Sequence, residues 1–202
     1  MSKTMFPKPG NFIYPVPAVM VSCQEADQKP NIITIAWTGT VCSDPPMAYI
    51  SVRKERHSYQ LIKESGCFVI NLPDKKLAHA CDYCGCTSGS KVDKFKECHL
   101  TPLQSSVISA PMIEEAPVSI ECKVTQIIPL GTHDMFLAEV VAVHVDDKYM
   151  DENNAFHMED IGMFAYEHGT YRELGEKLGT FGYSVRKKDT RKKSNKRKNV
   201  RR

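Results

Sequence analysis

The sequence predicts a mainly β protein with short helices, arranged as an antiparallel barrel. Two long segments rich in β-branched residues, 117–129 and 134–146, flank the hairpin signal Leu130-Gly131-Thr132-His133. At least four shorter segments have the same character, and the helical segments between them are short. A sheet of parallel strands would need longer crossover helices, so these patterns favour an antiparallel barrel over a βαβ sheet.

The shorter strands are expected where apolar, β-branched runs lie between polar turns. The first two form a hairpin across the polar segment 24–30, and the third follows the turn Asp44-Pro45-Pro46. The segments expected to be strands are 18–23, 31–37, 47–52, 67–71, 163–166 and 171–174.

Short helices are expected at three places. Ser58 is positioned to cap the first, which ends at Gly66. Asp74 can cap a second helix that runs to about Cys84. After the Gly/Ser-rich loop at 85–91, a further helical turn is expected within 91–97.

The chain divides into three parts by composition. Residues 1–16, with three prolines, predict an extended arm, and residues 17–185 form the expected domain. Residues 186–202 contain eleven Lys or Arg and one acid, whereas the rest of the chain has sixteen basic and twenty-three acidic residues. The net charge of +3 therefore combines an acidic body with a basic, flexible tail.

Several features predict a cytoplasmic protein without a membrane span. No segment approaches the ~20 apolar residues that a spanning helix needs, and the first residues lack the apolar core of a signal peptide. The eight cysteines are expected to be reduced, since 202 residues with 42% hydrophobic content can form a core without disulfides.

One charged stretch, Arg53-Lys54-Glu55-Arg56-His57-Ser58, is typical of a phosphate site. It places three permanent cations, a histidine and a hydroxyl at the start of an expected helix. The usual Gly-rich nucleotide motifs are absent from the sequence. Taken alone, the stretch fits a solvated charged loop before a helix better than a phosphate site, because charged residues are common at helix starts.

Two further stretches contain candidate ligand contacts. Residues 34–40 (TIAWTGT) place the single tryptophan where a strand ends, and the exposed backbone groups there suit the edge of a flat aromatic ligand. Residues 88–95 (SGSKVDKF) combine small residues with two lysines, as in a phosphate clamp. A tryptophan that closes one end of a barrel and an ordinary loop before a helix are the alternatives.

The order of these stretches resembles that of the flavin reductase-like family, specifically the flavoredoxin branch of the FMN-binding split barrels. The likeness runs from about Pro15 to Ser184. It depends on PVPAVMVS, NIITIAWTG, SDPPM, a strand ending in Arg53-Lys54, RHSY, GCFVINLP, SGSKVDKF and HGTY, in that order. The resemblance implies a split β-barrel of the antiparallel Greek-key type. The pyridoxamine phosphate oxidase type shares this barrel, but the RHS and WTG stretches match it less well.

The resemblance also implies residue roles. Thr34, Ala36, Trp37 and Thr38 match the segment that contacts the isoalloxazine edge and ribityl chain of FMN. Arg53, Lys54, His57 and Ser58 match the phosphate cluster, and Ser88, Lys91 and Lys94 match the loop that closes over the flavin. His168 matches a late histidine near the nicotinamide, with His157 as a nearby competitor. Family members are homodimers with FMN at the subunit interface.

The implied function is an oxidoreductase that passes electrons from NADH or NADPH to FMN and on to an acceptor, as an NAD(P)H-dependent flavin reductase does. An electron-transfer flavoprotein that acts with a redox protein partner is the first alternative. A nucleic-acid-associated protein acting through the basic tail is the second, although the tail lacks the aromatic residues of a stacking site.

The cluster Cys81, Cys84 and Cys86, with Cys98-His99 further along the chain, departs from the family pattern. Three readings are open: a metal site, a redox-active thiol pair, and plain thiols beside the flavin loop. The spacing lacks the second matching pair of a typical zinc site. No metal ligand is therefore assigned, and plain thiols are expected.

Overall fold

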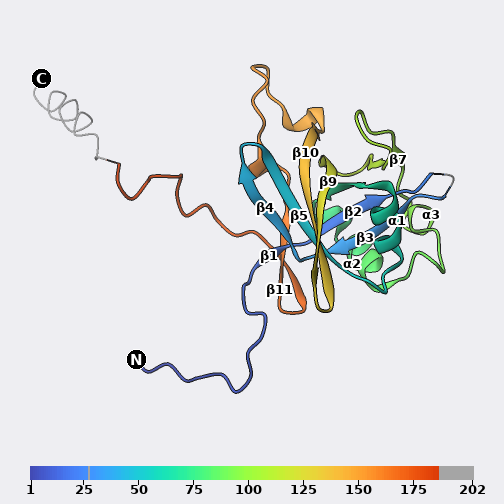
Figure 1. The fold of residues 1–202 in the computed structure, drawn as a ribbon. Helices are drawn as coiled ribbons and strands as arrows, with labels where there is room; N and C mark the ends of the chain where they lie inside the picture. Colours follow the sequence, from blue (N-terminus) through green and yellow to red (C-terminus); the bar gives the residue numbers. More distant parts are fainter. Residues whose placement is uncertain (27, 187–202) are drawn as a thin grey trace, which may run out of the picture.

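In a computed structural model, which describes residues 1–26 and 28–186, the core of the protein is a seven-stranded antiparallel sheet (Figure 1). Its strand order is β3-β2-β6-β9-β10-β5-β4. The strands are β2 (Val19–Cys23), β3 (Asn31–Ile35), β4 (Thr38–Ser43), β5 (Pro46–Arg53), β6 (Cys67–Leu72), β9 (Val118–Leu130) and β10 (His133–Val145). The predicted mainly β class and antiparallel pairing are confirmed.

Strands β2 and β3 form the predicted hairpin and are covered on both faces. Val19 and Val21 face the main core inside the sheet, while Met20 faces a second core beneath the helices. Every residue of β2 is buried. This double burial explains why the sequence there is an almost continuous apolar run without clear alternation.

The long hairpin of β9 and β10 forms the centre of the sheet. Both strands have thirteen residues and reverse at Gly131, whose φ of 66° suits a residue without a side chain. Two register shifts between β9 and β10 bend the ladder, as bulges do. The backbone N–H of Ser51 in β5 donates to the carbonyl of Trp37, 2.9 Å away, and so links the chain after β3 to the opposite side of the sheet.

The predicted strand 31–37 ends earlier than expected. β3 stops at Ile35, Ala36 and Trp37 form a bend, and Thr38 begins β4, a strand that the sequence did not predict. The bend arises because β4 pairs with β5 on the far edge of the sheet. A continuous β3 could not reach that partner.

Helix α1 (His57–Ser65) packs Leu61 and Ile62 into the main core. Its N-cap is Arg56 without a side-chain bond, so the expected cap by Ser58 is wrong. Ser58 is instead buried and accepts a hydrogen bond from Asn31 Nδ2 at 2.7 Å. Gly66 ends the helix in the left-handed conformation, as predicted.

The remaining helices cover the outer face of β2 and β3. Asp74 accepts from the backbone N–H groups of Lys76 and Leu77 at the 3-10 turn η1 (Lys75–Leu77), which leads into α2 (Ala78–Cys86). The predicted cap is therefore confirmed, and α2 extends two residues beyond the predicted end. Helix α3 (Lys94–Glu97) follows, capped by Asp93.

Short strands complete the structure. β1 (Val16–Pro17), β11 (Phe164–Glu167) and β12 (Thr170–Glu173) form a three-stranded sheet, and β7 (Pro102–Leu103) pairs with β8 (Met112–Ile113). Two 3-10 turns, η2 (Asp147–Tyr149) and η3 (Met158–Asp160), lie between β10 and β11.

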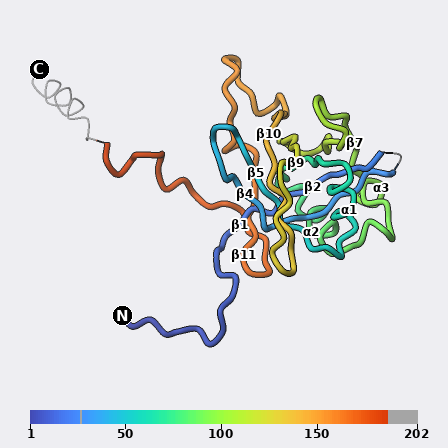
Figure 2. Tube along the Cα trace, in the orientation of Figure 1, coloured from blue at the N-terminus to red at the C-terminus, as the bar shows by residue number. Residues whose placement is uncertain are grey.

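The two ends of the described chain leave the barrel. The N-terminal arm before β1 and the segment after β12 run outward from the side of β1 and β11 (Figure 2). Large apolar side chains along them are exposed, among them Ile13, Leu178 and Phe181. The predicted basic tail lies, apart from Arg186, outside the described residues. No helix among the described residues is long and apolar enough to span a membrane.

Buried Glu121 in β9 anchors the loop between β7 and β8. Its carboxylate accepts hydrogen bonds from the backbone N–H groups of Ser106, Val107 and Ile108 at 2.7, 2.8 and 3.1 Å. The Nε2 atom of His144 lies 2.7 Å away. Burial acts to raise the pKa of Glu121, but these donors outweigh it, and the net pKa is lowered.

We predict that Glu121→Gln lowers the free energy of unfolding by about 1–3 kcal/mol at neutral pH, because an amide leaves buried backbone donors unsatisfied. A lowered carboxyl pKa contributes stability above the ordinary value of about 4.3, and this contribution disappears as pH falls through the native pKa. The difference between wild type and variant should therefore narrow in acid.

Urea unfolding across the pH range measures this difference. The control is Glu139→Gln, at an exposed position of β10. An equal effect of both substitutions would contradict the anchoring role.

Candidate functional site

Two adjoining cavities lie along β3 and the start of α1. The smaller has a volume of about 400 Å³ and the larger about 820 Å³. Ile33, Arg53 and Arg56 line both, so the cavities are two parts of one depression. The sequence stretches predicted to bind a ligand therefore meet at one place.

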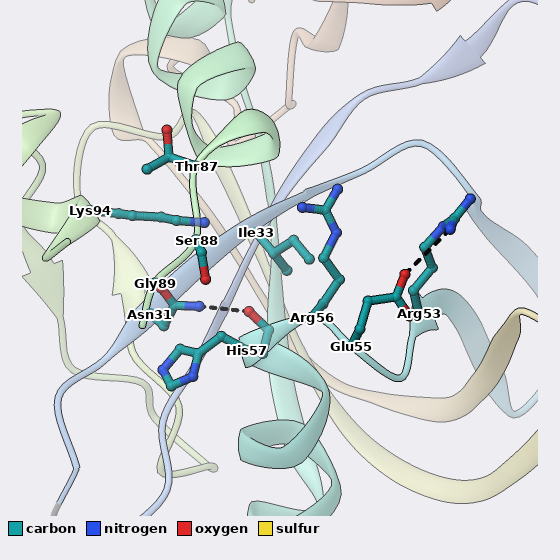
Figure 3. A pocket seen from close by; sticks show the side chains of 11 residues that line it. Asn31, Ile33, Arg53, Glu55, Arg56, His57, Thr87, Ser88, Gly89 and Lys94 are labelled. Carbon is teal, nitrogen blue, oxygen red and sulfur yellow. Dashed lines mark hydrogen bonds and ion pairs between the residues drawn. The ribbon is translucent and has the colours of Figure 1, made fainter. Parts of the chain in front are cut away.

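The smaller cavity is rich in basic side chains. Arg53, Arg56, His57 and Lys94 line it, against a single carboxylate, Glu55. Arg53 Nη1 contacts Glu55 Oε1 at 3.3 Å, which partly offsets its charge. In Figure 3, Lys94 and Arg56 reach toward the middle of the cavity from α3 and from the start of α1, with Ser88 between them. This donor set suits a phosphate group.

Lys94 is the unusual member of this set because it is buried. Its Nζ donates hydrogen bonds of 2.7 Å to the carbonyls of Ile32 and Cys84. Only 3% of the surface of Lys94 is exposed. Burial lowers its pKa. An ammonium has three donors, so one remains for an anion in the cavity.

The wall of the smaller cavity at residues 87–89 packs closely against β3. A Cβ atom added at Gly89 would lie 2.0 Å from Asn31 Oδ1. Asn31 in turn donates to Ser58, and both line the cavity. A side chain at position 89 would therefore have to displace the Asn31 amide, which is hydrogen-bonded to Ser58.

The larger cavity has an aromatic and backbone-rich lining. The bend at Ala36 and Trp37 contributes peptide groups, and the Oγ1 of Thr38 donates to the carbonyl of Tyr49 at 2.6 Å. The Oγ1 of Thr34 donates to the carbonyl of Cys81, which fixes β3 to α2. The lining residues are Gly10, Asn11, Phe12, Ile13, Val16, Ile33, Thr34, Ile35, Ala36, Trp37, Thr38, Tyr49, Ser51, Val52, Arg53, Arg56, Leu130, Thr132 and His133.

His168 lies at the turn between β11 and β12, one side chain away from this lining. Its ring stacks on Phe12 at 6.2 Å between centroids and meets Tyr14 edge-on at 5.6 Å. Its φ of 45° is in the left-handed region, and the residue is exposed. The competitor His157 lies elsewhere, with Nε2 3.3 Å from Asp151 Oδ2.

Comparison with known proteins identifies the family. The model of the flavin reductase like domain matches residues 11–175. The chain belongs to the flavin reductase-like domain family. Its membership, with the likeness to the flavoredoxin branch, confirms the resemblance found in the sequence.

The flavoredoxin of Desulfovibrio vulgaris (Miyazaki F) has a similar structure. The TM-score is 0.83 at 30% identity, over 92% of this chain and 99% of that one. The predicted split-barrel fold is thereby confirmed.

Two curated relatives extend the comparison. An uncharacterised protein of Aeropyrum pernix is 31% identical over 163 residues, which are 80% of this chain but only 57% of that protein. The FMN reductase (NADH) RutF of Escherichia coli (strain SE11) is 39% identical over 41 residues, which are 20% of this chain and 27% of that protein.

The structure brings together most of the residues that the family resemblance pointed to. Thr34, Ala36, Trp37 and Thr38 line the larger cavity, while Arg53, His57, Ser58, Ser88 and Lys94 line the smaller one. Three predicted residues line neither cavity: Lys54, Lys91 and His168. Lys54 Nζ instead contacts the buried carboxylate of Asp134 at 3.3 Å, and Lys91 is exposed.

Sequence reasoning did not assign six of the residues that line the smaller cavity: Asn31, Ile33, Glu55, Arg56, Thr87 and Gly89. Arg56 lies within the charged stretch that suggested a phosphate site, but it was not among the residues matched to the family's phosphate cluster, although it lines both cavities. Asn31 and Gly89 stand inside the motifs NIITIAWTG and SGSKVDKF. Their positions in these motifs could have marked them as site residues. Only the contact between the loop at Gly89 and β3 at Asn31 shows their structural role.

The cysteine cluster forms no metal site in the structure. No group of three or more potential metal ligands converges among residues 1–26 and 28–186. Cys81 and Cys84 are buried on α2, Cys86 is exposed, and all are free thiols. Cys84 Sγ lies 3.9 Å from Cys98 Sγ.

We predict that Gly89→Ala destabilises the protein by about 1–3 kcal/mol, because the added methyl group must displace the Asn31 side chain or the loop. Gly175→Ala is the matched control, since a Cβ there has no neighbour within 4 Å. Thermal and urea unfolding of both variants provide the measurement. Equal stability of the two variants would contradict the close packing of this loop.

Proposed function

We propose that this protein is an FMN-binding flavoprotein with oxidoreductase function. The observation that carries the proposal is the continuity of a cation-lined cavity with a larger cavity of aromatic and backbone lining. A ligand that carries both a phosphate and a planar ring needs a cation-lined cavity for the phosphate and an adjoining cavity with aromatic side chains and backbone groups for the ring. Family membership and the named FMN reductase relative support FMN as the cofactor.

In this proposal the smaller cavity binds the phosphate of FMN. Arg56 and Arg53 supply charge-assisted hydrogen bonds, and Lys94 supplies its third N–H donor. The first turn of α1, at His57 and Ser58, adds free backbone N–H groups and the positive end of the helix dipole. Ser88 contributes a hydroxyl from the facing loop.

The larger cavity binds the isoalloxazine ring. Trp37 and Tyr49 provide apolar surface, and the peptide groups of Ala36–Thr38 pair with the polar edge. The bound flavin supplies the hydride or electron transfer. The protein's own residues orient it and exclude water from one face.

The proposed electron route begins at a reduced nicotinamide and ends at an acceptor that takes electrons from the flavin. NADH is the donor named for the FMN reductase relative, which supports NADH or NADPH here. His168 is the residue proposed beside the nicotinamide, since it stacks on Phe12 in the cavity lining. Transfer to a redox protein partner, without release of FMN, is the alternative.

We further propose a homodimer with FMN at the subunit interface. Residues 10–13 of the N-terminal arm line the larger cavity, yet Phe12 and Ile13 remain largely exposed. The exposed apolar side chains on the N-terminal arm and on the segment after β12 would be buried by a second copy of the chain. Sedimentation of the protein with and without FMN measures this assembly, and a monomer in both conditions would contradict it.

The domain division and the cellular location belong to the same proposal. The division is an arm at 1–16, the FMN domain at 17–185 and a basic tail at 186–202. Eight free cysteines support the reducing environment of the cytoplasm. The alternative of nucleic-acid binding depends on the tail, which lies almost entirely outside the described residues.

An absorption spectrum of the purified protein, before and after FMN and anaerobic NADH, tests the function. We expect a yellow protein, or a colourless one that takes up FMN, and bleaching when NADH is added. Uptake of FMN without bleaching would favour the electron-transfer alternative. A protein that takes up no FMN would contradict the whole proposal.

We predict that Arg56→Ala weakens FMN binding by about 10- to 100-fold, since a hydrogen bond to a charged group contributes about 1.5–3 kcal/mol. Binding of riboflavin, which lacks the phosphate, should change far less. Lys54→Ala is the control, because Lys54 contacts Asp134 and lines neither cavity. Fluorescence titration measures both ligands, and equal losses for FMN and riboflavin would argue against a phosphate contact.

A further inference from the structure

Two thiols lie next to each other where α2 and α3 meet. Cys84 is in the last turn of α2, and Cys98 directly follows α3. Their sulfur atoms are 3.9 Å apart. Cys84 is fully buried, while Cys98 is partly exposed and open to solutes.

These two thiols flank a segment that walls the cavity. Thr87, Ser88, Gly89 and Lys94 all lie between them in the chain and line the smaller cavity. The contact is also direct, because Lys94 Nζ donates to the carbonyl of Cys84. A covalent link between the thiols would therefore close a loop around the cavity wall.

We propose that hydrogen peroxide oxidises the Cys84 and Cys98 thiols to a disulfide, and that this disulfide restrains the loop between α2 and α3 that lines the smaller cavity. The oxidant is hydrogen peroxide, which a reduced flavin generates with dioxygen. The source of the peroxide and the effect on the cofactor rest on the proposed function, whereas the formation of the disulfide with added peroxide does not.

The two cysteines have different parts in the reaction. Burial raises the pKa of both thiols, but Cys98 is more exposed, and a hydrogen bond from the Cys84 thiol together with the Lys94 ammonium favours its thiolate. Cys98 is therefore the attacking sulfur and Cys84 the resolving one. The raised pKa values make the reaction slow at low peroxide.

The reaction balances in two steps. The Cys98 thiolate attacks one peroxide oxygen, the O–O bond breaks, and protonation of the leaving hydroxide gives water and a sulfenic acid on Cys98. Cys84 Sγ then attacks Cys98 Sγ, the S–O bond breaks, and the departing hydroxide takes the Cys84 proton as a second water. The two thiols lose two electrons, and one peroxide is reduced to two waters. The sulfur atoms approach from 3.9 Å to about 2.05 Å.

The disulfide would slow the release of FMN. It joins the ends of the segment that carries Ser88, Gly89 and Lys94, and so limits the outward motion of the loop. Restraining a loop in its bound conformation favours binding because less conformational entropy is lost. Reduction by a thiol restores the freer loop.

Mass spectrometry of the peroxide-treated protein tests the link. Trypsin leaves Cys84 in the peptide 77–91, with Cys81 and Cys86, and Cys98 in the peptide 97–123, with Cys122. We expect these peptides to be joined in wild type and in Cys86→Ser, the exposed control. They should stay separate in Cys84→Ser and Cys98→Ser. Absence of the link in wild type, or its persistence in either of these two variants, overturns the proposal.

The rate of FMN release tests the consequence. We expect release from the oxidised protein to be slower than from the reduced protein by about threefold or more, and unchanged by peroxide in Cys98→Ser. Equal rates in cross-linked and reduced wild type would overturn the restraint. A protein that forms the link but takes up no FMN would contradict the proposed function and leave the disulfide standing.

Discussion

The buried ammonium of Lys94 joins the three elements on which the site depends. It lies on α3, and it donates to a carbonyl of β3 and to a carbonyl of α2. A charge at this depth is stable only if its donors are satisfied. The requirement to pair them fixes the loop 87–93 against the sheet, and this loop is one wall of the smaller cavity. The same group thus stabilises the local fold and gives the cavity its charge.

The close approach of loop and strand is the second constraint. Gly89 has no room for a side chain beside Asn31, and Asn31 reaches across to Ser58 on α1. Residues of three separate motifs therefore meet at the smaller cavity, where Asn31 of β3 connects the loop to α1. The bend at Ala36 and Trp37 then turns the chain from β3 into β4, so the larger cavity begins where the smaller one ends. Both cavities are therefore built around β3, with α1 and the loop 87–93 beside it.

Much of the fold and of the candidate site could be predicted from local patterns. The β9–β10 hairpin, the Gly66 stop and the Asp74 cap each depend on residues close in sequence, and the structure contains all three. Ser58 and Lys54 show where this reasoning fails. Ser58 is a residue type that commonly caps helices, but here it is buried and hydrogen-bonded to Asn31. Lys54 forms an ion pair with Asp134 and does not line the cavity. Asn31 and Asp134 are both distant in sequence from the residues they contact, so no local sequence pattern predicts these two contacts.

The sequence by itself determined the family, the antiparallel strands and the three stretches that line the cavities, because short-range patterns and their order are written in neighbouring residues. Only the tertiary structure decided which cations face the cavity, placing Arg56 there and Lys54 elsewhere. It alone brought Cys84 and Cys98 together across α3. The physical reason is that the direction in which a side chain points depends on its packing and on partners distant in sequence, and both are fixed only when the whole chain folds.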